Sequence, residues 1–179
     1  MINKNELINL AKEAIKTKLE GRNFIIDEKI KKKFKEKRAC FVTLILDGKL
    51  RGCVGSLTAR QELWKDVLEN AINSAFFDSR FYPLTKKEFD KIKIEISVLN
   101  VPKEIEYKNE GELKKKIFKK GVIIKKGYCS ATYLPQVWGQ IQDKDEFLSS
   151  LCLKAGLNAS AWKKEKLNVF VYDIEKVRE

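Results

Sequence analysis

The chain of 179 residues contains no histidine, and this absence removes several kinds of active site at once. A Cys–His or Ser–His pair for nucleophilic catalysis cannot form within the chain. Zinc sites and iron–sulfur clusters need clustered soft ligands, but the cysteines are scattered and show no C-x-x-C spacing. There are four of them: Cys40, Cys53, Cys129 and Cys152. We therefore predict that the protein holds no metal ion and no other cofactor.

Long apolar runs are missing as well. No segment approaches the roughly 18 residues that a membrane-spanning helix needs, and the first residues, Met1 to Glu6, lack the apolar core of a signal peptide. We expect a cytoplasmic protein that does not bind a membrane. Disulfides are rare in that reducing compartment, so Cys40 and Cys152, which lie in apolar stretches, are expected to be small buried hydrophobic residues.

The composition is that of a globular protein, with 44% hydrophobic and 35% charged residues. A chain of this length fits one domain over residues 1–179, built from two closely joined lobes. The net charge is +12, but only 6 of the 37 basic residues are arginine. Because arginine is favoured where phosphate geometry is recognised, the lysines indicate a solvated surface more than a nucleic-acid site. A basic RNA-associated protein remains an alternative.

Hydrophobic periodicity and capping signals predict an α+β fold with mainly antiparallel sheets flanked by helices. Helices are expected at 5–19, 28–37, 58–77, 85–90, 109–119 and 144–155, with a short one after Pro135. Strands are expected at 39–46, 49–54, 92–101, 121–126, 128–133 and 168–177. The start of the third helix depends on Thr58, which begins a capping-box pattern.

The most informative motif is Leu50–Ser56, with the sequence LRGCVGS, on the second strand of a hairpin that turns at Asp47-Gly48. Side chains alternate along a strand, so Arg51 and Cys53 are expected to share one face. Gly52 allows a backbone or a ligand to come close, and Gly55 leaves the sulfur of Cys53 uncovered. A two-residue loop would place Cys53 opposite Val42 and Arg51 opposite Leu44, among apolar neighbours.

An anion site is a further expectation near this motif. If a helix begins at Thr58, its free N–H groups, Arg51 and Ser56 could together hold a carboxylate or a phosphate. The simpler alternative is that Thr58 only caps the helix. Three aromatic residues, Tyr82, Trp138 and Trp162, could line a pocket, but residues of this kind are more often part of the core.

Several sequence blocks together resemble the AMMECR family, over nearly the whole chain from about Asn5 to Val177. The blocks are Leu50–Leu57, Phe77–Thr85, Glu95–Leu99, Leu134–Trp138 and Lys154–Leu157 with Trp162. The resemblance implies a two-lobed α+β fold of unestablished activity, with Leu50–Ser56 as its signature motif. Relatives occur beside, or fused to, a Memo-type protein and a radical S-adenosylmethionine enzyme, which are the implied partners. The chain departs from the family at Ser79, where many relatives have proline, and at Lys120, where many have histidine.

Three interpretations of the motif remain open. In the first, the protein is a cysteine-dependent enzyme with Cys53 as nucleophile, Arg51 favouring its thiolate, and acid–base help from Asp78, a lysine or the substrate. In the second, it binds a small anionic ligand or an acidic partner segment, with arginine side chains as the clamp. The ligand-binding residues would be Gly52, Gly55, Ser56, Asp78, Arg80 and Gln136. In the third, the motif is structural, and Arg51 pairs with Asp78.

Overall fold

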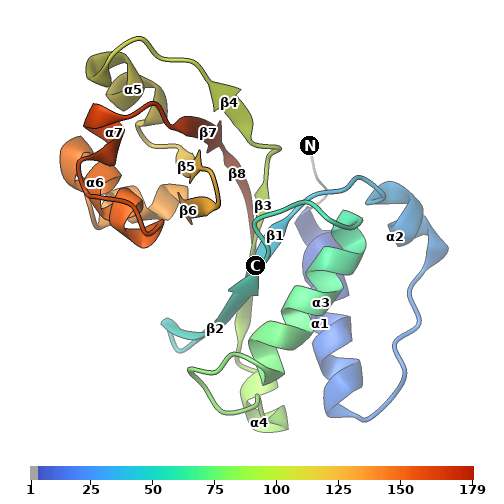
Figure 1. Ribbon diagram of the computed structural model, residues 1–179. Helices are drawn as coiled ribbons and strands as arrows, with labels where there is room; N and C mark the ends of the chain where they lie inside the picture. The colour runs from blue at the N-terminus through green and yellow to red at the C-terminus, as the bar shows by residue number, and fades with distance from the viewer. Residues whose placement is uncertain (1–3) are drawn as a thin grey trace. The chain divides into compact units, whose positions relative to one another are not determined.

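The structure, a computed structural model, describes residues 4–179 and divides the chain into two compact units (Figure 1). The first unit runs to Leu99 and takes in Glu175–Glu179 at the other end of the chain, and the second is Asn100–Ile174. Each unit contains one four-stranded sheet and its own helices. This confirms the predicted α+β fold of two lobes. No helix in the described part of the chain is both long and apolar enough to cross a membrane.

The sheet of the first unit has the strand order β2-β1-β3-β8. Its strands are β1 (Cys40–Leu46), β2 (Lys49–Gly55), β3 (Lys93–Leu99) and β8 (Ile174–Arg178). Two long helices, α1 (Lys4–Leu19) and α3 (Leu63–Phe76), pack against each other and against this sheet (Figure 1). Val42 and Leu44 of β1 are fully buried in the same apolar cluster as residues of both helices, whereas Phe41 and Thr43 are half-buried. Because side chains alternate along a strand, β1 has one face in the core, with Val42 and Leu44, and one less buried face, with Phe41 and Thr43, which we call the open face.

Two short helices complete the first unit, and both begin where local sequence signals predict. In α2 (Glu28–Lys33), the Asp27 side chain accepts a hydrogen bond from the Lys29 N–H. In α4 (Lys86–Phe89), Thr85 and Glu88 form a reciprocal capping box. Caps of this kind satisfy N–H groups that have no partner within the helix.

The sheet of the second unit has the order β4-β7-β5-β6 and is also antiparallel. Its strands are β4 (Lys103–Ile105), β5 (Gly121–Lys126), β6 (Cys129–Tyr133) and β7 (Asn168–Tyr172). The helices are α5 (Glu110–Ile117), α6 (Lys144–Lys154), α7 (Ala161–Lys164) and the 3-10 helix η1 (Pro135–Gly139). A separate apolar cluster, centred on Phe147, Trp162 and Leu151, forms the core of this unit.

The prediction of one closing strand over 168–177 is wrong. The segment is divided at Asp173 into β7, which belongs to the second sheet, and β8, which belongs to the first. A change of sheet within a continuous apolar pattern leaves no local signal, because both halves keep the period of two. The predicted burial of Cys40 and Cys152 is confirmed, and all four thiols are free. Burial raises the pKa of both thiols.

Candidate functional site

The motif lies on β2, an edge strand, and its local geometry is set by a β-bulge. The hairpin has the predicted two-residue loop, with positive φ at Asp47 and Gly48. The register shifts beyond it, because Leu44 lies opposite Gly52 and Ile45 opposite Leu50. Arg51 is therefore the extra residue on β2 and has no partner on β1.

The bulge makes the predicted register wrong for Cys53, which lies opposite Thr43 and not Val42. The sulfur atom of Cys53 is 3.2 Å from the Thr43 hydroxyl oxygen. The expectation of purely apolar neighbours fails for the same reason. Cys53 is half-buried, and its neighbour belongs to the open face of the sheet. Since the bulge interrupts the alternation of side chains, the shared face for Arg51 and Cys53 no longer follows from strand geometry.

The two glycines of the motif allow close packing within the chain. A Cβ atom at Gly52 would lie 2.2 Å from the carbonyl oxygen of Ser74, on α3. A Cβ atom at Gly55 would lie 2.3 Å from the ring of Phe41 and 2.5 Å from the carbonyl oxygen of Cys40. The close approach predicted for Gly52 is thus that of another backbone segment. Beside Gly55, the space is filled by an aromatic ring.

Arg51 is bound by groups of the chain itself. Its Nε donates to Glu88 at 2.8 Å, and its Nη2 donates both to Glu88 at 3.2 Å and to the carbonyl oxygen of Tyr82 at 2.9 Å. The guanidinium also lies over the ring of Phe81, 5.7 Å from its centre. Arg51, together with hydrogen bonds from Thr85, lowers the pKa of Glu88 to about 2. Arg51 therefore anchors the start of α4 to the sheet.

The guanidinium that contacts Cys53 is that of Arg80. Its Nη2 donates to the carbonyl oxygen of Cys53 at 3.0 Å, and the N–H of Cys53 donates to Asp78 at 2.8 Å. Arg80 also forms a two-pronged ion pair with Asp78, through Nε at 2.9 Å and Nη2 at 2.7 Å. These donors hold the pKa of Asp78 well below its usual range, the Arg80 side chain being the largest cause. The predicted pairing of Arg51 with Asp78 is therefore wrong.

Ser56 is also bound by a carboxylate of the chain. Its hydroxyl donates to both oxygens of Asp66, at 2.8 and 2.7 Å. Asp66 lies in the first turns of α3, is only 3% exposed, and accepts further hydrogen bonds from the Cys40 N–H and the Asn70 amide. A negative charge is favourable near a helix N-terminus, and at the start of α3 the Asp66 carboxylate of the chain itself supplies that charge.

The predicted helix start at Thr58 is wrong by five residues, because α3 begins at Leu63. Its first N–H groups are satisfied by the segment before β1: Leu63 donates to the carbonyl of Glu36 and Trp64 to that of Phe34. These partners are distant in sequence, so a pattern search around Thr58 could not find them.

Gln136 lies in η1, in the second unit, and is exposed, so it is not among the groups that the first unit brings together. Trp138 and Trp162 are buried in the second core, as expected, but Tyr82 is 91% exposed. Phe77 is also exposed, at 66%, and unlike Tyr82 it was not singled out as an aromatic candidate from the sequence. The sequence feature that could have drawn attention to Phe77 and Tyr82 is their position on either side of Asp78 and Arg80, which form an ion pair.

The comparisons with known proteins agree over nearly the whole chain. Residues 8–177 match the AMMECR1 family. A protein of Nanoarchaeum equitans is 39% identical over 175 residues, which cover 93% of this chain and 95% of that protein. A protein of Aquifex aeolicus is 37% identical, with 97% and 91% covered. The crystal structure of an uncharacterized protein from Pyrococcus horikoshii aligns with a TM-score of 0.80 at 34% identity, over 97% of this chain and 89% of that one.

Proposed function

The chain belongs to the AMMECR1 family, and from this premise we propose that it is a partner-binding component of a modification system with a Memo-type protein and a radical S-adenosylmethionine enzyme. The docking surface is the segment 77–85, which follows α3. One observation carries the proposal. Phe77 and Tyr82 are 66% and 91% exposed on a segment whose neighbouring groups are fixed by ion pairs.

Aromatic side chains on a fixed backbone are effective anchors, because the segment itself loses little conformational freedom when a partner covers it. The backbone is held at two places. Arg51 binds the carbonyl of Tyr82, and Asp78 binds the N–H groups of Cys53 and Arg80. The aromatic side chains themselves are left free for a partner.

Two exposed charges that follow the docking segment in the sequence favour an acidic partner. Lys86 and Lys87 of α4 are exposed and form no ion pair within residues 4–179. By contrast, two groups expected to hold a small free anion already bind carboxylates of the chain: Arg51 binds Glu88 through Nε and Nη2, and Ser56 binds Asp66. This supports a protein surface over a small anion as the binding partner. Complementary charge would add mainly to the rate of association and to specificity.

The experiment is a binding assay between the full chain and a purified Memo-type protein, with Phe77→Ala and Tyr82→Ala variants. Removing an aromatic anchor at an interface costs about 2 kcal/mol or more, so each variant should weaken the Kd by about 30-fold. Tyr128→Ala is the matched control, because Tyr128 is a fully exposed tyrosine at the tip of the β5–β6 hairpin. Unchanged Kd values for both docking variants would refute the proposed surface.

Cysteine-dependent catalysis is the second candidate, favoured by the polar row that crosses the open face of the first sheet. Cys53 lies opposite Thr43, and Thr43 in turn lies opposite Glu95 on β3. The sequence patterns did not identify this row, because the bulge is what places Thr43 opposite Cys53. The Thr43 hydroxyl contacts the Cys53 sulfur, and Glu95, which is ion-paired with Lys176 and Arg178, lies opposite Thr43 in the sheet. In this arrangement the hydroxyl could pass a proton from the sulfur to the Glu95 carboxylate during attack on an electrophile.

Alkylation by iodoacetamide across pH tests this second candidate, with Cys53→Ser identifying the reacting thiol. Thr43→Val and Glu95→Gln should each slow the reaction of Cys53 and change its pH profile, whereas Arg51→Ala should have little effect, since Arg51 is bound to Glu88. Identical profiles for the parent, Thr43→Val and Glu95→Gln would eliminate the relay.

A further inference from the structure

A groove of about 420 Å³ lies in the first unit, between α1 and the segment that joins α1 to α2. This segment, residues 22–27, returns beside α1 (Figure 1), and Lys33 at the end of α2 pairs with Glu6 in the first turn of α1. One wall of the groove is a single face of α1, and the other is the segment itself. The apolar side chains that line the groove belong to the core or pack against it: Leu10, Phe24, Ile26 and Ile30.

The segment alternates as a β-strand does, but it pairs with no strand in the described part of the chain. Phe24 and Ile26 pack against the core, whereas Ile25 between them is 90% exposed. The N–H and C=O groups of residues 23–26 form no hydrogen bond within residues 4–179. Unpaired backbone groups in an extended chain are a template on which another extended chain can pair.

Both ends of the segment are fixed. Gly21 has the positive φ of a helix end, and the next N–H, that of Arg22, donates to the carbonyl of Thr17 in α1. At the other end, Asp27 caps α2. Since the backbone is already held on both sides, pairing with a peptide orders few further residues of the chain, and less binding free energy is lost to that ordering.

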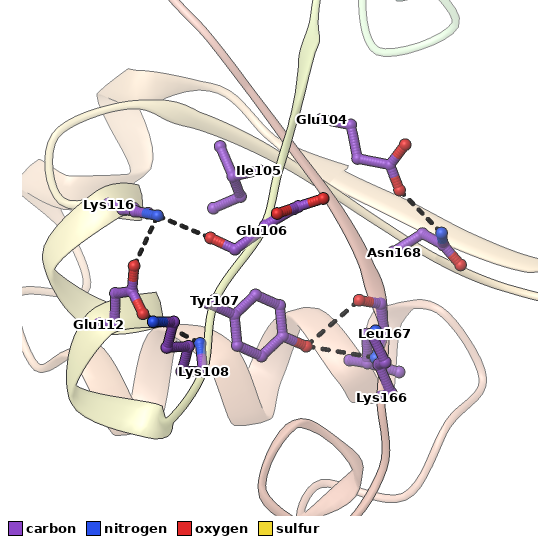
Figure 2. A pocket seen from close by; sticks show the side chains of 10 residues that line it. All are labelled: Glu104, Ile105, Glu106, Tyr107, Lys108, Glu112, Lys116, Lys166, Leu167 and Asn168. Carbon is purple, nitrogen blue, oxygen red and sulfur yellow. Dashed lines mark hydrogen bonds and ion pairs between the residues drawn. The ribbon is translucent and has the colours of Figure 1, made fainter.

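In the second unit, by contrast, the chain provides its own partner where two strands separate. The β4–β7 ladder ends at Ile105 opposite Val169, and a cavity of about 710 Å³ lies there (Figure 2). The phenol oxygen of Tyr107 donates to the Leu167 carbonyl and accepts from the Leu167 N–H, both at 3.2 Å. No side chain of residues 4–179 does the same for residues 23–26. Their backbone groups are therefore available to a partner.

The charges left unpaired at the groove are negative. Glu6 and Arg22, which line it, both form ion pairs within the unit. Glu13 and Asp27 also line it, are exposed, and form no ion pair in the part of the chain that the structure describes. Because the segment runs opposite to α1, Glu13 lies toward its start and Asp27 is at its end. In a chain with a net charge of +12, two such carboxylates beside an apolar groove favour a basic partner.

We propose that this groove binds a basic segment of a partner protein as an added β-strand along residues 23–26. Alternate residues of an extended chain direct their N–H and C=O groups to the same edge, so two of these four residues would bond the partner's backbone. Its apolar side chains would contact Leu10 and Ile30, and a lysine or arginine on each side would meet Glu13 and Asp27. Backbone pairing supplies affinity in this mode, and the side chains supply specificity. The surface is separate from the segment 77–85.

The test is a titration of the isotope-labelled full chain with the peptide Lys-Val-Thr-Val-Lys, acetylated and amidated at its ends so that only the lysines are charged. NMR measures both the amide shifts and the exchange of each amide with water. We expect saturable shifts, and exchange about tenfold slower at alternate residues of 23–26 when the peptide is bound. The peptide Glu-Val-Thr-Val-Glu has the opposite charges and should bind about tenfold more weakly or worse.

Variants of the chain test the two carboxylates. Glu13→Gln with Asp27→Asn should weaken binding of the lysine peptide about fivefold to tenfold, as for the loss of two exposed charge contacts. Asparagine caps a helix as well as aspartate does, so α2 is retained. Glu36→Gln with Asp90→Asn is the control, because both carboxylates are exposed and neither lines the groove.

Three results would overturn the proposal. The first is the absence of saturable binding, or equal affinity for the basic and acidic peptides. The second is saturable binding without slower exchange at alternate residues of 23–26, because side chains alone would then hold the peptide. The third is slower exchange at these residues that increases with the concentration of the chain alone, which would assign the groove to a second copy.

Discussion

Replacement of Gly52 by alanine tests whether this glycine serves packing within the chain or access of a ligand. The new Cβ atom would lie 2.2 Å from the carbonyl oxygen of Ser74 and 3.1 Å from its carbonyl carbon. Both are backbone atoms of α3, so no side-chain rotation relieves the clash. The edge strand β2 must instead move away from the helix.

The cost follows from what that movement disturbs. Overpacking costs about 1–3 kcal/mol. The movement also strains the hydrogen bond from the Val54 N–H to the Ser74 hydroxyl, 2.9 Å long, and a lost hydrogen bond adds about 1 kcal/mol. We therefore expect a loss of about 3 kcal/mol in the free energy of unfolding. In a chain of this size, that lowers the Tm by about 6–12 °C.

Thermal melts followed by circular dichroism measure this difference. Gly139→Ala is the matched control, because a Cβ atom there has no heavy atom within 4 Å, and its Tm should stay within about 2 °C of the parent. A Gly52→Ala variant that melts together with the parent would refute the packing argument. That result would instead favour the alternative that Gly52 leaves room for a ligand to approach.

Two further predictions concern the carboxylates that engage the motif. The pKa of Glu88, about 2 in the parent, should rise toward the ordinary value of about 4.3 in Arg51→Gln, measured by carboxyl NMR titration. Because this pKa is lowered by folding, the ionised carboxylate stabilises the fold above about pH 4.3. That contribution is lost as the pH falls toward 2, so Glu88→Gln should flatten the acid limb of the stability curve. For Asp66→Asn, we expect a loss of about 2–4 kcal/mol in urea unfolding, since the buried carboxylate accepts from Cys40, Ser56 and Asn70; a loss below about 0.5 kcal/mol would contradict its bonding role.

Local signals predicted the elements well wherever the deciding contacts are local. Asp27 and Asp143 cap the helices that follow them, and Gly156 has the positive φ of a helix end. The predicted hairpin loop at Asp47-Gly48 is confirmed for the same reason, because its conformation depends on two adjacent residues.

The sequence drew attention to the motif groups, but it did not predict which groups they bind. Arg51 finds its acceptor 37 residues later, at Glu88, and the Cys53 N–H finds Asp78 25 residues later. For each donor of the motif, the chain offers several carboxylates as possible partners. Only the folded arrangement of α3, α4 and β2 decides which carboxylate lies within hydrogen-bond distance. The bulge was not predicted from the sequence, and it decides that Thr43 lies opposite Cys53.

The bulge itself gives a last prediction. Arg51 has no partner on β1, and its neighbours Leu50 and Gly52 face consecutive residues, Ile45 and Leu44. Deleting Arg51 therefore joins two correctly paired halves of β2 and leaves their register and faces unchanged. The deletion should cost no more than Arg51→Ala, that is, the contacts of the guanidinium alone. Deleting Val54, a paired residue, should instead shift the rest of the strand by one position and turn its side chains to the wrong faces. Urea unfolding of the three variants measures the difference, and a Val54 deletion as stable as the Arg51 deletion would show that β2 is not bulged at Arg51.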